Sequence, residues 1–169
     1  MKQRGFTLIE LMVTVVVLAI LVTVALPGFN TMIDNQRIQS TQRTMLSAIN
    51  LARSEATHRN QTVTIASAGG ADWEDGISIY TDNDAGGNTA FTGADTLIKD
   101  ISGAISDAVT VRTDGNAFIS FQGNGMLNEA GNTVTMAICD ERGPAFGRAI
   151  NISRVGRASV STDIASCTP

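Results

Sequence analysis

The N-terminal part of the chain contains a hydrophobic stretch of 21 residues, 6–26, whose only polar members are three threonines and Glu10. As a helix it spans roughly 31 Å, which matches the hydrocarbon core of a bilayer. The stretch is longer than the ~7–15 apolar residues of a cleaved secretory signal, and no small-residue cleavage site follows it. Lys2 and Arg4 precede it and favour a cytoplasmic N-terminus. We therefore predict a retained membrane helix, with the remainder of the chain outside the cytoplasm.

Glu10 places a carboxylate inside this apolar stretch. At the centre of a bilayer such a group costs ~2.5–3.5 kcal/mol on insertion scales, and less near either end. One interpretation is that the side chain reaches the headgroup region from its position near the cytoplasmic end. The other, which we favour, is that it pairs with a positive group from another subunit. An acidic side chain is short, and glutamine would cost less at a position with no such partner.

The fragment GFTLIE at residues 5–10 follows a short basic leader, residues 1–5, and opens the apolar stretch. This arrangement resembles the class III signal of type IV prepilins and type II secretion pseudopilins. The resemblance implies that a prepilin peptidase cleaves between Gly5 and Phe6, and that the new Phe6 amine is N-methylated. It also implies that Glu10 pairs with the Phe6 amine of a neighbouring subunit in a filament. Pro27 fits the same pattern, in which a proline bends or locally melts the helix near the membrane exit.

The rest of the chain changes from a helical to a strand-like pattern. Apolar residues at Ile38, Met45, Ile49, Ala52 and Ala56 follow one helical stripe, and Asn60 is a plausible stop. After this point the apolar residues alternate with polar or small ones, and Gly/Asn clusters separate the segments. The alternating pairs are Val63/Ile65, Ile77/Ile79, Val109/Val111, Ile119/Phe121, Val134/Met136/Ile138 and Ile150/Ile152. We predict an α+β fold in which a long N-terminal helix packs on one or more antiparallel β-sheets.

Several body fragments occur in an order that resembles the GspH/FimT (FimU-like) family of minor pilins and pseudopilins. These are ARSEA at 52–56, WEDGISIYTD at 73–82, FQGNG at 121–125, CDERG at 139–143, GRAI at 147–150 and GR at 156–157. The resemblance implies a chain divided into a leader (1–5), a transmembrane and filament-core helix (6–27), an amphipathic helix (28–60) and a β-rich globular domain (61–169).

The same resemblance implies a structural function. The chain is expected to be a minor pilin of a type IV pilus, in the complex that primes assembly or caps the tip. The alternatives are a type II secretion pseudopilin of the GspH type and a DNA-binding minor pilin for DNA uptake. Its expected partners are other major and minor pilins, the prepilin peptidase, the inner membrane and, in the last case, double-stranded DNA. The body is expected in the periplasm and later in the filament or at its tip.

Cys139 and Cys167 are the only cysteines of the chain. In a body outside the cytoplasm an even pair of cysteines indicates a disulfide, whereas in the cytosol it would more often be two buried thiols. A Cys139–Cys167 bond would tie the C-terminal tail to the strand around residues 134–138. On the loop-entropy model, a disulfide that closes a loop of this size stabilises the fold by ~3 kcal/mol.

Catalytic and metal chemistry is poorly supported. His58, the only histidine, is expected at an exposed helix end without a nucleophile. The cysteines lack the companion ligands of a zinc site. The loop at 82–87 starts like a calcium loop, but Gly86 and Gly93 occupy positions where ligands are required. We expect no enzymatic activity, no cofactor and no metal site.

Four arginines, at positions 142, 148, 154 and 157, fall in the last 28 residues, where Asp163 is the one acid. The local charge is 4 − 1 = +3 in a chain whose net charge is −4. Strand alternation predicts Arg148 and Arg154 on one side of a strand, with Arg157 projecting from the following turn. Such side chains can neutralise phosphates without reading sequence, so Arg148, Arg154 and Arg157 are candidates for DNA binding. Resemblance to the FimT branch implies a Gly-Arg-x-Arg motif here, but Ser159 stands in place of the second arginine, and a solvated or salt-bridged hairpin is the favoured alternative.

Overall fold

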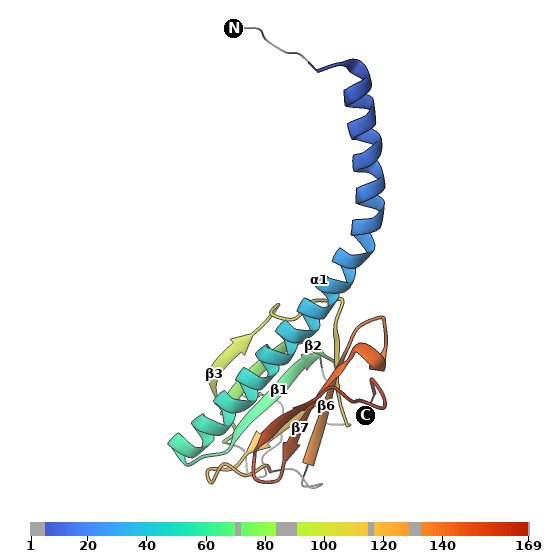
Figure 1. Cartoon of the computed structure of the whole chain (residues 1–169). Helices are drawn as coiled ribbons and strands as arrows, with labels where there is room; N and C mark the ends of the chain where they lie inside the picture. Colours follow the sequence, from blue (N-terminus) through green and yellow to red (C-terminus); the bar gives the residue numbers. More distant parts are fainter. Residues whose placement is uncertain (1–5, 70–71, 84–90, 115–116, 129–132, 169) are drawn as a thin grey trace. The chain divides into compact units, whose positions relative to one another are not determined.

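The computed structural model describes residues 6–69, 72–83, 91–114, 117–128 and 133–168, and only the helical backbone for 24–27. Over these residues the chain forms one long helix, eight strands and a short 3-10 helix, η1 (Pro144–Phe146) (Figure 1). The chain consists of two compact units, Met1–Gln36 and Arg37–Pro169.

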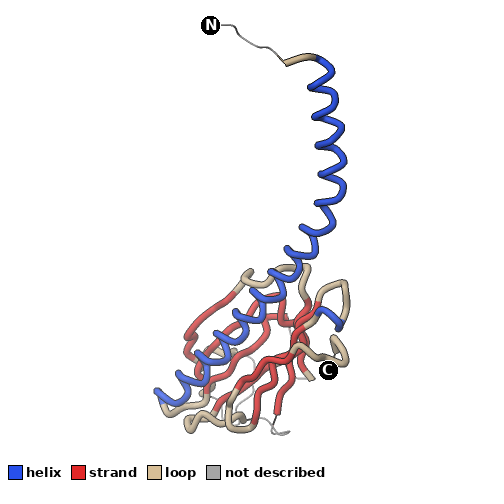
Figure 2. The backbone as a smooth tube through the Cα atoms, viewed as in Figure 1, coloured by secondary structure: helices blue, strands red, loops and turns tan. Residues whose placement is uncertain are grey.

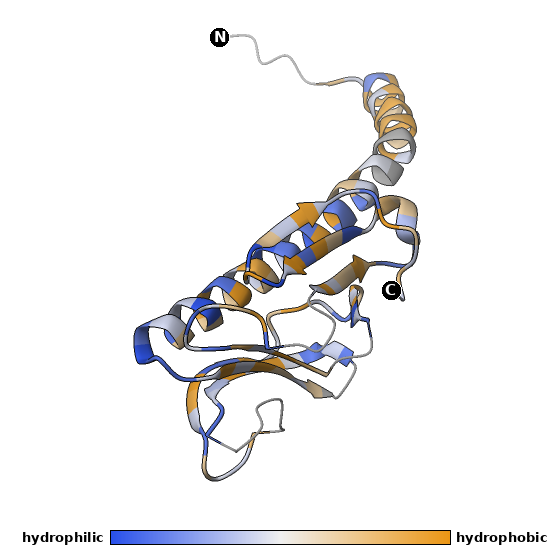
Figure 3. Ribbon diagram, turned by 90° about the horizontal axis from the view of Figure 1, so that it is seen from below, coloured by the Kyte–Doolittle hydropathy of each residue, from blue (hydrophilic) through white to orange (hydrophobic). Residues whose placement is uncertain are grey.

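The first unit contains the start of α1, a helix that runs from Leu8 to Arg59. All described side chains from Phe6 to Thr23 are exposed, and most of them are apolar (Figure 3). Within the described part of the chain, α1 is the one helix long and apolar enough to cross a membrane. The helix continues without interruption through Pro27, so local melting, one of the two effects that we expected of this proline, is not present.

The second unit begins on the amphipathic part of α1. The predicted stripe is confirmed, because Ile38, Met45, Ile49, Ala52 and Ala56 are all buried, each at most 1% exposed. The helix ends at Arg59. Asn60, the predicted stop, has a φ of 52°. Asparagine is one of the few residues that tolerate this left-handed conformation, which closes many helices.

Two four-stranded antiparallel sheets make up the remainder of this unit (Figure 2). The first sheet has the order β3-β2-β1-β5, formed by Thr96–Ile101, Asp72–Thr81, Val63–Gly69 and Phe118–Phe121. The second has the order β4-β6-β7-β8, formed by Thr110–Thr113, Thr133–Cys139, Arg148–Ser153 and Ala158–Ser161. The α+β prediction of a helix packed on antiparallel sheets is therefore confirmed.

One hydrophobic core fills the space between the helix and both sheets. Alternate residues of each strand point to the same face, and the inward ones join the stripe of α1 in a single cluster of buried side chains. Trp73, Ile119 and Phe121 are fully buried in this cluster. The predicted alternating pairs lie in β1, β2, β5, β6 and β7, and at β4 with Val109 just before its first residue. Strands β3 and β8, at the edges of the two sheets, were not predicted.

A half-buried ion pair joins the two sheets. On β2, the Glu74 carboxylate accepts hydrogen bonds from Arg112 Nη1 of β4 at 2.7 and 2.6 Å, and Asp72 lies 3.2 Å from Arg112 Nη2. Val111 N also donates to Glu74 Oε2 at 3.3 Å. Burial raises the pKa of the Glu74 carboxyl, but the hydrogen bonds from Arg112 and the backbone outweigh it and hold the pKa below its ordinary value of 4.5.

Glu74→Gln is expected to lower the free energy of unfolding by about 1–3 kcal/mol at pH 7, because it leaves Arg112 without its main partner. A carboxyl with a depressed folded pKa stabilises the fold above its unfolded pKa, and that contribution is lost as the pH falls through the folded pKa. The stability of the wild type should therefore fall more steeply below pH 4.5 than that of the variant. Urea unfolding followed by the emission of Trp73, the single tryptophan, measures both effects.

Glu55→Gln is the matched control, because Glu55 pairs with Arg59 on the helix surface at 2.7 Å. Surface pairs of this i,i+4 kind are worth ~0.3–0.5 kcal/mol. Two results would contradict the role given to the Glu74–Arg112 pair. One is an equal loss of unfolding free energy in the two variants, and the other is the same fall of unfolding free energy at acid pH in Glu74→Gln and in the wild type.

A disulfide joins Cys139, at the end of β6, to Cys167 in the C-terminal tail, as predicted. The two cysteines are 28 residues apart, and their Cα atoms lie 5.9 Å from each other. Cys139 is buried, so the bond anchors the tail to the edge of the core.

Cys167→Ser is expected to lower the free energy of unfolding by ~3 kcal/mol, because the unfolded chain is no longer constrained by the bond. A reductant should destabilise the wild type by a similar amount and leave the variant unchanged. The measurement is the urea midpoint with and without the reductant. A wild-type midpoint that does not respond to reduction would show that the bond adds no stability.

Candidate functional site

The start of α1 is ordered by Thr7. Its Oγ1 accepts a hydrogen bond from Glu10 N at 3.3 Å, and its carbonyl oxygen accepts one from Leu11 N at 3.2 Å. Thr7 thus satisfies backbone donors that the first turn of a helix leaves unpaired. Phe6 is 83% exposed. Among the described residues no ion pair involves the Glu10 carboxylate, and Gly5 lies outside them.

The following turns of α1 are apolar on every side. Their large side chains are 45–77% exposed from Leu8 to Val22. Thr14 and Thr23 donate their hydroxyl groups to carbonyl oxygens of their own helix, both at 2.8 Å, and so present little free polarity. A helix that is hydrophobic all round requires apolar surroundings, either lipid or other helices.

Besides the start of α1, the hairpin between β7 and β8 is a second candidate site. Its turn is closed by hydrogen bonds from Gly156 N to Ser153 O at 2.8 Å and from Ser153 N to Arg157 O at 3.0 Å. We call residues 153–157 the arginine turn. Arg154 and Arg157 are both exposed on it, on either side of Val155 and Gly156.

The structure separates Arg148 from the arginine turn. Arg148 is the first residue of β7, which ends at Ser153. With a rise of ~3.3 Å per residue, it lies about 20 Å from Arg154. Arg154 belongs to the turn, so our expectation that the two arginines share one side of a strand was wrong.

Arg142, another of the four arginines in the last 28 residues, pairs with a carboxylate. Its Nη2 lies 2.6 Å from Asp140 Oδ2, and its guanidinium carbon is 4.7 Å from the centre of the Phe146 ring. Burial raises the pKa of the Asp140 carboxyl, but the hydrogen bonds from Arg142 outweigh it and hold the pKa below its ordinary value of 3.8. The pair is neutral overall at physiological pH, so Arg142 contributes no net charge to a binding surface.

Arg53 of α1 holds the arginine turn in place. Its Nη2 donates to Val155 O at 3.0 Å, and its Nε donates to Gly125 O at 3.2 Å. Leu127 N donates to Arg154 O at 2.9 Å, which joins the same turn to the loop after β5. One helical guanidinium therefore connects two loops that lie far apart in the sequence.

Three glycines allow this close approach to the end of α1. A Cβ on Gly123 would lie 2.8 Å from backbone and side-chain atoms of Asn60, and one on Gly125 (φ 76°) would lie 2.9 Å from Thr57 Cγ2. Gly156 has a φ of 74°, and a Cβ there would overlap Gly125 O and lie 2.8 Å from Arg53 Nε. The fragments ARSEA, FQGNG and GR thus meet at one place. The sequence showed their order but not this contact.

The remaining candidate features are His58, a buried group of polar side chains and the loop at 82–87. His58 is exposed in the last turn of α1, as predicted. Thr64 Oγ1, fully buried, donates to Asp82 Oδ2 at 3.2 Å and lies 2.7 Å from Ser120 Oγ. The loop weighed as a calcium site lies mostly outside the described residues. Within the described part of the chain, no three His, Cys, Asp or Glu side chains are grouped as metal ligands.

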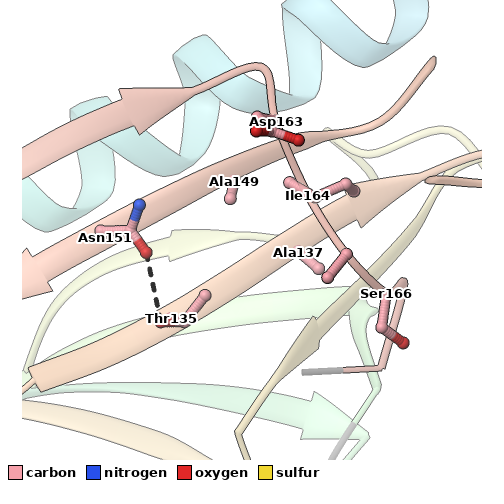
Figure 4. Close-up of a pocket in the computed structure, with 8 residues that line it drawn as sticks. Thr135, Ala137, Ala149, Asn151, Asp163, Ile164 and Ser166 are labelled. Carbon is pink, nitrogen blue, oxygen red and sulfur yellow. Dashed lines mark hydrogen bonds between the residues drawn. The ribbon is translucent and has the colours of Figure 1, made fainter. Parts of the chain in front are cut away.

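A pocket of about 210 Å³ lies between the second sheet and the C-terminal tail (Figure 4). Thr135, Ala137, Ala149 and Asn151 line it from β6 and β7, and residues 163–166 line it from the tail. Thr135 Oγ1 and Asn151 Oδ1 are hydrogen-bonded at 3.2 Å.

Comparison with protein families identifies the chain. A model of the type II transport protein GspH matches residues 41–156, and a model of the prokaryotic N-terminal methylation motif matches residues 1–26. The chain therefore belongs to the GspH family, whose members are pilins and pseudopilins. Comparison with curated proteins finds no match.

Two crystal forms of the type IV minor pilin FimU from Pseudomonas aeruginosa (strain PAO1) are similar to the structure. Their TM-scores are 0.65 and 0.63, each at 26% identity. The similarity covers 78% and 76% of this chain, and 96% and 98% of the FimU chains. The predicted pilin fold and family are confirmed. The family is structural, it assembles with other pilins in a filament, and the apolar N-terminal helix fits an inner-membrane-anchored pilin with a periplasmic body.

Gly156→Ala is expected to lower the free energy of unfolding by about 3 kcal/mol, since it adds an overlap with Gly125 O to the cost of a positive φ. Gly103→Ala is the control, because Gly103 has a φ of 66° but nothing within 4 Å of an added Cβ. It should cost only ~1–2 kcal/mol. The measurement is urea unfolding of both variants. Equal costs would contradict the close packing of the arginine turn.

Proposed function

We propose that the chain is a minor pilin incorporated into a type IV pilus, within the complex that primes assembly or caps the tip. The observation that carries this proposal is the similarity to the type IV minor pilin FimU, which extends over nearly the whole FimU chain. The methylation-motif match at residues 1–26 supports it, because filament pilins need a processed N-terminus.

In this proposal the peptidase cleaves between Gly5 and Phe6, and the released Phe6 amine is methylated. The all-round apolar part of α1 first anchors the protein in the inner membrane and then packs among the helices of the filament. Glu10 pairs with the Phe6 amine of a neighbouring subunit. In apolar surroundings such a pair is favourable only when both charges are present and correctly placed, so it selects one axial register between subunits.

A pseudopilin of a type II secretion machine is the second candidate, because the family model that matches the body is that of a type II transport protein. The two functions share the same processing and the same helix packing. DNA uptake stays a prediction. Arg154 and Arg157 remain available for phosphate, but Arg148 lies at the other end of β7 and Arg142 is paired with Asp140.

Glu10→Gln is expected to reduce the amount of the chain in sheared, purified pili at least about tenfold, since one lost ion pair in an apolar bundle exceeds ~1.4 kcal/mol. Immunoblotting of the pilus fraction against the membrane fraction measures the ratio. Thr14→Val is the control, because the Thr14 hydroxyl bonds only within its own helix. Normal incorporation of Glu10→Gln would refute the register role.

A further inference from the structure

We propose that the arginine turn and the adjacent edge strand β8 form a docking surface for an acidic segment of a neighbouring pilin. This inference rests on the proposed function, because it requires assembly with other pilins. The surface is formed by Arg53, Arg154, Val155, Arg157 and Val160.

The arginines of this surface carry positive charge. Within the described part of the chain, no carboxylate forms an ion pair with Arg53, Arg154 or Arg157. On α1, the Glu55 carboxylate pairs with Arg59. Nε and Nη2 of Arg53 donate hydrogen bonds to backbone carbonyl groups. Carbonyl groups accept these hydrogen bonds but do not neutralise the charge of Arg53.

Two valines near these charges are exposed. Val155, on the turn itself, is 57% exposed, and Val160, on β8, is 42% exposed. Val160 is paired with Ile150 across the β7–β8 ladder, so the two side chains point to the same, core side of the sheet. Strand β8 is the last of its sheet, and an uncovered edge presents unpaired backbone groups to a partner.

Hydrogen bonds hold the arginine turn in one conformation before any partner binds. Arg53 donates a hydrogen bond to Val155 O, and Leu127 N donates one to Arg154 O. Ser153 N donates to Arg157 O, and Ser153 Oγ accepts a hydrogen bond from Arg157 N. A hollow lined by Asn50, Arg53, Ser54 and Thr57 lies on the flank of α1 from which Arg53 reaches the turn. A turn held in this way loses little conformational entropy on binding, which favours affinity.

This combination fits a protein partner better than a nucleic acid. Protein interfaces are enriched in arginine and contain apolar contacts at their centre, whereas nucleic-acid interfaces are strongly positive and polar. Here Val155 lies between Arg154 and Arg157, and Val160 follows on β8. The surface has no aromatic residue to stack on a base, and the chain as a whole carries a net charge of −4. A patch of acidic side chains around an apolar contact is the complement of this surface.

The test is photo-crosslinking of the full-length chain in piliated cells. A benzoylphenylalanine residue replaces Val160 in one strain and Leu97 in another. Leu97 is the matched control, because it is 49% exposed on the edge strand β3 of the other sheet. We expect an adduct at position 160 in which mass spectrometry identifies a second pilin and an acidic contact peptide, and at least a tenfold weaker adduct at position 97.

Charge reversal at Arg154→Glu with Arg157→Glu should reduce the adduct at position 160 about tenfold. Arg43→Glu with Lys99→Glu, two exposed sites outside this surface, makes the same change in net charge and should leave the adduct unchanged. Both variants must show the Cys139–Cys167 bond and wild-type amounts in the membrane. Because the reversed side chains are exposed, we expect both to fold.

Three outcomes would overturn the docking surface: no pilin adduct at position 160, equal adducts at 97 and 160, or an adduct that survives the Arg154/Arg157 reversal. A salt-dependent shift of a 30-base-pair duplex by the detergent-solubilised chain, lost in Arg157→Glu, would assign the surface to DNA instead. A wild-type chain absent from pili would refute the proposed function itself, whereas a chain present in pili without the adduct refutes only the docking surface.

Discussion

Burial of the apolar stripe of α1 is the interaction on which the folded body depends. From Ile38 to Ala56 this stripe packs against the inward faces of both sheets, and without it neither sheet has a cover for its apolar side. The same packing fixes the rotation of the helix about its axis. It thereby directs Arg53 and Thr57, which lie off the stripe, toward the loops after β5 and β7.

The glycines of those loops follow from this geometry. Gly123, Gly125 and Gly156 meet the last two turns of α1 so closely that side chains would overlap them. The result is that the exposed arginine turn is attached to α1 through the guanidinium of Arg53, and to the loop after β5 through a backbone hydrogen bond from Leu127 N. A surface turn held this firmly is suited to recognition, since its shape does not have to be selected on binding.

Residue patterns predicted the parts of the fold that depend on local periodicity. The helical and strand periodicity of apolar residues predicts the stripe from Ile38 to Ala56, the stop at Asn60 and the inward residues of six strands. Strands β3 and β8 escaped prediction because their side chains are largely exposed, which removes the alternating signal. The partners of Arg142 and Arg53 also escaped it, because they depend on tertiary contacts. The pairing of Cys139 with Cys167 was predictable since there are only two cysteines.

The central claim is that the chain is cut after Gly5 and that α1 becomes part of a filament. Mass spectrometry of the N-terminal peptide from sheared, purified pili tests this most directly. The account predicts a mature chain that starts with N-methylated Phe6 and is recovered with other pilins. A chain recovered with Met1 and the leader intact, or an unmethylated Phe6 in assembled pili, would contradict it.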